Sequence, residues 1–188
     1  MSRLGLAYPL SLALTVWFSL ALGQVFPPTG GRYVYSDGSQ QELVPTGEGY
    51  RVRYWKEGRL FREDRIRVEG EGLFLLGVGL PEGYFPFTPP LYLYPSRLDL
   101  GLAWGGGARF RGQRVALSAR VEGIEGVRVK EGAFIAYRVR VASTTEKGGT
   151  DLKEIFLVPG LGVVAYRTGG AWVELLKMPE PLSPKGGP

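Results

Sequence analysis

Apolar and polar residues alternate with a period of two along most of the chain after residue 24. Residues 49–55, GYRVRYW, place Tyr50, Val52 and Tyr54 on one side and Arg51, Arg53 and Trp55 on the other. Such alternation is typical of a strand with one buried and one solvated face. A KEG turn at 56–58 leads into a second alternating run, so the two runs predict a β-hairpin.

The same style continues to residue 178, and no segment shows a convincing helical period. EGLFLLGVGL (71–80) is more continuously apolar, as a strand buried on both faces would be. The pattern predicts about nine to eleven antiparallel strands, and a twisted sheet that large must curl, split into two layers or close. The predicted fold class is therefore all-β, with one large curved antiparallel sheet resembling half a barrel; a closed barrel or a sandwich are the alternatives.

A proline-rich segment at 81–95, PEGYFPFTPPLYLYP, interrupts the alternation. Its prolines argue against a helix and against a central strand. We expect a linker or crossover that joins two halves, 25–80 and 96–178, of a single β domain. Its aromatic residues either line the mouth of a cavity or lie over an open end of the sheet as a plug, which we favour. They are still the first candidates for contact with a ligand: Tyr84, Phe85, Phe87, Tyr92 and Tyr94.

Two glycines lie in EIFLVPGLGVVAYR (154–167), between two apolar runs. A phosphate-binding loop would need a helix after the glycines, and here a second strand pattern follows. Gly160 and Gly162 therefore predict the bend of a hairpin, where glycine supplies the positive φ that a tight turn requires.

The N-terminus has the pattern of a secretory signal peptide at residues 1–24. One arginine precedes an uncharged run from Leu4 to Gly23, which ends in the small-x-small pattern of a cleavage site. An uncleaved signal helix that anchors the protein is the alternative. The expected location is the periplasm or the extracellular space. The Pro- and Gly-rich tail at 179–188 is predicted to be disordered.

The composition excludes several kinds of chemistry. The chain has no cysteine and no histidine, so it can hold no disulfide, no Cys or His metal site and no Ser-His-Asp triad. Glu63 and Asp64 are adjacent, so in a strand they face opposite ways and cannot form an acid–base pair. We expect no catalytic, cofactor-binding or metal-binding residues, and the protein is predicted not to be an enzyme.

The net charge is +5, and 17 of the 23 cationic residues are arginine. The arginines alternate with apolar residues and form no basic cluster, so no nucleic-acid partner is expected. They predict a solvated face with Glu63, Glu69 and Glu154 as cross-strand partners; an anion-binding surface is the alternative. The absence of asparagine suggests a thermophile, although a GC-rich genome would favour the same composition.

Short motifs in the second half carry a family resemblance. They are a Gly and a Trp a few residues apart, then G-x-F-x-x-Y-x-V, then P-G-x-G-x-V, then a closing apolar strand. The matching residues are Gly101, Trp104, Gly132, Phe134, Tyr137, Val139, Pro159, Gly160, Gly162, Val164, Val173 and Leu175. This pattern resembles a domain of unknown function that recurs in exported bacterial proteins, similar in style to the curved sheets of periplasmic lipoprotein carriers. The resemblance implies no catalytic residues.

These observations predict an exported, non-enzymatic protein of the cell envelope. Its concave apolar face is the candidate site for a lipid or another hydrophobic ligand. A structural or protein-interaction module with a self-filled core is the alternative, and a carboxylate-based hydrolase is the weakest hypothesis. An envelope protein is a candidate partner, and contact with the membrane is expected only through an uncleaved N-terminal segment.

Overall fold

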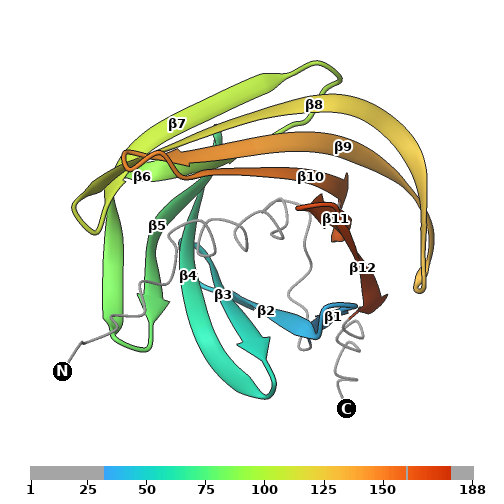
Figure 1. Ribbon diagram of the computed structural model, residues 1–188, viewed down its shortest axis with the longest axis horizontal. Helices are drawn as coiled ribbons and strands as arrows, with labels where there is room; N and C mark the ends of the chain where they lie inside the picture. Colours follow the sequence, from blue (N-terminus) through green and yellow to red (C-terminus); the bar gives the residue numbers. More distant parts are fainter. Residues whose placement is uncertain (1–31, 160, 179–188) are drawn as a thin grey trace, which may run out of the picture.

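The computed structural model describes residues 32–159 and 161–178, which form a closed barrel of antiparallel strands (Figure 1). Consecutive strands are neighbours, and β1 closes the ring by pairing with β12. The strands are β1 (Tyr33–Tyr35), β2 (Ser39–Pro45), β3 (Gly49–Lys56), β4 (Arg59–Glu69), β5 (Gly72–Leu80), β6 (Gly83–Pro95), β7 (Ala103–Phe110), β8 (Gln113–Val129), β9 (Gly132–Thr145), β10 (Thr150–Val158), β11 (Gly162–Thr168) and β12 (Ala171–Lys177).

The all-β, antiparallel prediction is confirmed, and the sheet takes the closed-barrel alternative. The preferred half-barrel is wrong because β1 pairs with β12 and closes the ring of described strands. The described residues contain twelve strands, more than expected, since 33–35, 39–45 and the proline-rich segment are also strands. No helix among the described residues is long and apolar enough to cross a membrane. The predicted signal peptide at 1–24 and the predicted disordered tail at 179–188 lie outside the described residues.

Tight hairpins join neighbouring strands wherever the sequence offers the right turn residues. In the KEG turn between β3 and β4, Glu57 has φ 50° and Gly58 has φ 74°. Two successive positive φ values match the right-handed twist of the flanking strands. The bend between β10 and β11 is also confirmed as a hairpin: Leu161 N–H donates to Val158 O at 3.0 Å, and Gly162 has φ 117°. Gly160 lies outside the described residues.

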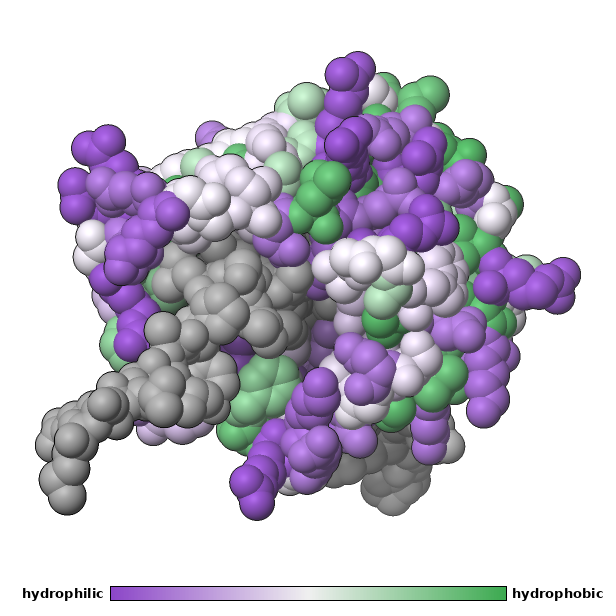
Figure 2. Space-filling model, in the orientation of Figure 1, coloured by the Kyte–Doolittle hydropathy of each residue, from purple (hydrophilic) through white to green (hydrophobic). Residues whose placement is uncertain are grey.

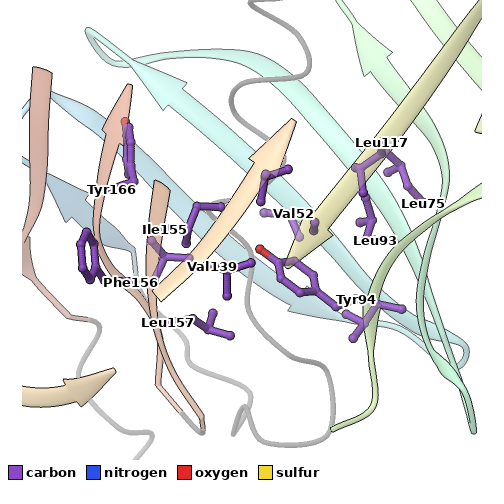
Figure 3. Close-up of a cluster of buried hydrophobic side chains, with 14 of the residues drawn as sticks. Val52, Leu75, Leu93, Tyr94, Leu117, Val139, Ile155, Phe156, Leu157 and Tyr166 are labelled. Atoms are coloured by element: carbon purple, nitrogen blue, oxygen red, sulfur yellow. The ribbon is translucent and has the colours of Figure 1, made fainter. Parts of the chain in front are cut away.

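The period-two pattern sorts side chains between the inside and the outside of the ring. Alternate residues converge on the interior from opposite walls, while Phe156 points away from Ile155 and Leu157 (Figure 3). We call these inward-facing side chains the inner wall. Its fully buried members include Val52, Leu75, Leu91, Leu93, Tyr94, Val121, Val139, Ile155, Leu157 and Leu175. The inner wall is therefore predominantly aliphatic.

The proline-rich segment is a strand of the barrel, so the prediction of a linker with a plug is wrong. β6 pairs with β5 on one side and with β7 on the other. The sheet tolerates its prolines because the ladder is incomplete there. Leu75 pairs with Leu91 and Gly77 with Pro86, which leaves Pro89 and Pro90 in an irregular stretch. Only Phe87 and Thr88 pair with β7. Proline is compatible with a strand where no N–H is required.

Candidate functional site

Polar side chains are buried at several positions of this apolar barrel. They are Gln41, Arg62, Asp64, Ser143 and Lys153, each at most 4% exposed. Arg62 and Asp64 alternate in phase with the buried Ile66 along β4, and Lys153 alternates in phase with Ile155 and Leu157 along β10. The charged groups of β4 and β10 therefore belong to the inner wall.

Arg62, Asp64 and Tyr54 form one satisfied group. The Arg62 guanidinium donates to both carboxylate oxygens of Asp64, from Nε at 2.5 Å and from Nη2 at 2.8 Å. Tyr54, which pairs with Arg62 across the β3–β4 hairpin, donates its hydroxyl to the same carboxylate at 3.1 Å. Burial raises the pKa of Asp64 to about 6, and Arg62 opposes that rise. Asp64 is therefore ionised at neutral pH, and its charge is compensated locally.

Lys153 has a different environment. Its Nζ lies 4.4 Å from the centroid of the Tyr166 ring, and the Tyr166 hydroxyl donates to Asp37 at 2.9 Å. Within the part of the chain that the structure describes, no hydrogen bond or ion pair reaches Nζ. Burial lowers the pKa of Lys153 to about 8; the carboxylates of Asp151 and Asp37 oppose this, and Arg62 adds to it. The ammonium group is thus desolvated, and no carboxylate of the described residues contacts it.

The topology places these groups toward one end of the barrel. In a ring of consecutive antiparallel strands, alternate connections lie at the same end. The β1–β2, β3–β4 and β9–β10 turns therefore share an end. Asp37 lies in the first of these turns, Tyr54 and Arg62 flank the second, and Lys153 follows the third. The apolar residues of the inner wall continue from Lys153 along β10 toward the opposite end.

The outer face carries the charge pairs that the alternation predicted. Arg53 of β3 contacts Glu63 of β4 at 3.1 Å, as predicted. Glu69 instead contacts Arg67 of its own strand, at 2.7 Å, so the prediction of a cross-strand partner is wrong for Glu69. Glu154 forms ion pairs with Arg138, at 3.4 Å, and with Arg167, at 2.9 Å. Glu63 and Asp64 do face opposite sides of β4, as expected. Hydrophilic side chains are spread widely over the face of the molecule that Figure 2 shows. The arginines in these pairs are therefore explained by a solvated outer face, without an anion-binding surface.

Open grooves lie on the surface, and residues that the structure describes line two of them. One has a volume of about 290 Å³ and crosses β8 to β11, and its lining includes Glu122, Arg140, Lys153, Glu154 and Arg167. The other has a volume of about 570 Å³, and its lining includes Thr88, Arg109, Arg114, Thr144 and Glu146. Both are lined largely by outward-facing residues of the wall.

The five aromatic residues predicted to contact a ligand do not gather at one site. Tyr94 is fully buried and Phe87 is stacked on Phe110, with ring centroids 4.5 Å apart. Phe85 is half-buried and lies beside the same Phe110 ring. Tyr84 is 42% exposed under the Arg65 guanidinium. Tyr92 donates its hydroxyl to Glu71 O on an exposed stretch. The structure thus buries Phe87 and Tyr94 and leaves Tyr84, Phe85 and Tyr92 at least partly exposed.

The sequence interpretation missed the buried charges, although a signal was present. In FREDRIRV, Arg62 and Asp64 share the phase of Ile66, and in DLKEIFLV, Lys153 shares the phase of Ile155. A charged residue in the apolar phase of a strand marks a polar group on the buried face. The interpretation of these strands relied on the alternating arginines, which lie on the opposite, solvated face.

A scan against protein-family models finds no match to this chain, and searches of curated proteins and of solved structures find none either. The resemblance to exported bacterial domains stays a prediction. Those of its motif residues that the structure describes lie at turns and in the wall: Gly101 has φ 81°, and Trp104 Nε1 donates to Leu93 O at 2.7 Å.

Proposed function

We propose that this protein is an exported, non-enzymatic protein of the cell envelope that binds a lipid or another hydrophobic ligand on its inner wall. The observation that carries the proposal is an aliphatic inner wall in a ring of twelve strands. About eight strands already give an interior that side chains just fill, and the diameter grows with strand number. Larger barrels commonly enclose ligands or channels, so the size and polarity of this ring support a ligand-binding role.

The proposed location rests on the signal-peptide pattern of residues 1–24. Cleavage would release the barrel into the periplasm or the extracellular space, and an uncleaved segment would tether it to the membrane. The charge pairs on the outer face suit contact with an aqueous compartment. An envelope protein is a candidate partner, whereas the scattered arginines give no support to a nucleic-acid partner.

A structural or interaction module with a self-filled core is the second candidate. It is favoured by the burial of the inner wall: Val52, Leu75 and Leu93 have no exposed surface. A carboxylate-based hydrolase has less support, because the carboxylate of Asp64 is engaged by Arg62 and Tyr54 instead of facing a second carboxylate.

A matched pair of substitutions on β8 separates the two candidates. Ala119 is inward-facing and 5% exposed, whereas Ala116 lies on the outer face in the same strand. If the interior holds a ligand, Ala119→Phe occupies part of that space and abolishes lipid uptake from a host lipid extract, while Ala116→Phe does not. If the core is self-filled, Ala119→Phe overpacks it and costs about 1–3 kcal/mol of stability. Unimpaired lipid uptake by Ala119→Phe would overturn the ligand proposal.

A further inference from the structure

Lys153 is a charged group whose burial the fold alone does not explain. It lies on the inner wall in the same phase as Ile155 and Leu157, and only 4% of its surface is exposed. An ammonium group carries three hydrogen-bond donors. In the described part of the chain none of them has an acceptor; the Tyr166 ring is the contact that Nζ makes. A charge buried without a partner is costly, and the cation–π contact offsets part of that cost.

The nearby Arg62 shows how this barrel satisfies a buried charge that serves the fold. Arg62 meets the carboxylate of Asp64 through two hydrogen bonds, and Tyr54 adds a third to the same carboxylate. Lys153 has no such counter-ion in contact among the residues that the structure describes. Its difference from Arg62 indicates that its acceptor comes from outside the described residues.

The groups around Lys153 restrict what that acceptor can be. Asp37 accepts hydrogen bonds from Tyr166 and from the backbone and hydroxyl of Ser39, so its oxygens are engaged. Asp151 lies two residues before Lys153 on β10, and Arg62 approaches from β4. Two carboxylates near one ammonium would repel a doubly charged group such as a phosphate monoester. A group with a single negative charge fits this balance better.

We propose that Lys153 binds the carboxylate of a long-chain carboxylic acid whose hydrocarbon chain lies along the inner wall. This inference rests on the proposed function and names its ligand class. The carboxylate accepts hydrogen bonds from Nζ as a charge-assisted pair. Ile155, Leu157 and Val139 continue the inner wall beyond the lysine, so the side chains that a hydrocarbon chain would meet there are apolar.

The test compares two probes on the full-length protein after removal of bound lipid. Sodium hexadecanoate carries the carboxylate, and its methyl ester has the same chain without the charge. Binding is measured for the wild type, for Lys153→Met and for the control Lys147→Met, which removes a charge from the exposed β9–β10 turn. Lys153→Met is expected to weaken hexadecanoate binding by roughly 10- to 100-fold and to leave ester binding unchanged. Lys147→Met is expected to match the wild type with both probes.

The outcomes distinguish this inference from the function on which it rests. If the wild type and Lys153→Met bind hexadecanoate equally well, Lys153 has no role in recognition and the inference is overturned, while ligand binding in the barrel stands. The inference is also overturned if the wild type binds the ester as tightly as the carboxylate. If the wild type binds neither probe, the inference is overturned, and the proposed function is then decided by the uptake of lipid from the host extract. Ester binding by Lys153→Met also reports that the variant is folded.

Discussion

Replacing Lys153 by methionine should stabilise the ligand-free protein at neutral pH. Methionine keeps the unbranched apolar stem of the side chain, up to the position of Cε, and removes the desolvated charge. Burial lowers the pKa of Lys153 from 10.5 to about 8. At 1.36 kcal/mol per pKa unit, this shift corresponds to a penalty of about 3 kcal/mol while the lysine is charged in both states.

The pH dependence gives this prediction its signature. Below about pH 8, the folded and unfolded states both carry the charged lysine, so the full penalty applies. Between about pH 8 and 10.5, the unfolded state binds more protons than the folded state, and wild-type stability from this group rises with pH. The advantage of Lys153→Met should therefore be largest at pH 7 and should shrink as the pH approaches 10.5.

Urea unfolding followed by circular dichroism, at pH 7 and at several values up to 10.5, measures this difference. Lys147→Met is the control, because an exposed substitution is expected to change stability by no more than about 0.5 kcal/mol at any of these pH values. A Lys153→Met variant that is less stable than the wild type at pH 7 would refute the reasoning. So would a stabilisation that does not change with pH, since it would come from packing alone.

Two further substitutions test other parts of the barrel. Arg62→Met leaves the Asp64 carboxylate buried without its guanidinium and should lower the free energy of unfolding in urea by about 3–5 kcal/mol. Glu63→Gln breaks the outer pair with Arg53 and should lower it by about 1 kcal/mol or less. Similar costs for the two variants would contradict the inner-wall assignment of Arg62. Gly58→Ala, at φ 74° in the β3–β4 turn, should lower stability by about 1–2 kcal/mol, whereas Gly126→Ala in β8 should not; an equal effect of the two would show that the turn conformation does not limit stability.

The strands were largely predictable because their pattern is local. The alternation at 49–56 and 59–69 identified β3, β4 and the glycine turn between them, and the pairs of Glu63 and Glu154 followed from the charged phase. Closure was not predictable, since the pairing of β1 with β12 joins residues about as far apart as the described chain allows. The pairing of two strands this far apart in the sequence produces no local pattern from which it could be recognised.

The proline-rich strand was missed for a different reason. Proline argues against a strand only where its missing N–H would have a partner, and the incomplete ladder around Pro89 and Pro90 depends on how β5 and β7 meet β6. Lys153 was missed because a charged residue in a strand is assigned to the solvated face by default. Its position two residues before the buried Ile155 indicates instead that it lies on the buried face.

Native mass spectrometry of the protein, purified gently from the envelope fraction of its own host, tests the central claim most directly. We expect a species heavier than the polypeptide, with an extra mass that denaturation releases as a lipid or a long-chain acid. The same spectrum tests the predicted signal peptide, because its removal would lower the mass of the polypeptide by that of about residues 1–24. A bare polypeptide that stays bare after incubation with host lipid extract would contradict the claim and leave the self-filled structural barrel.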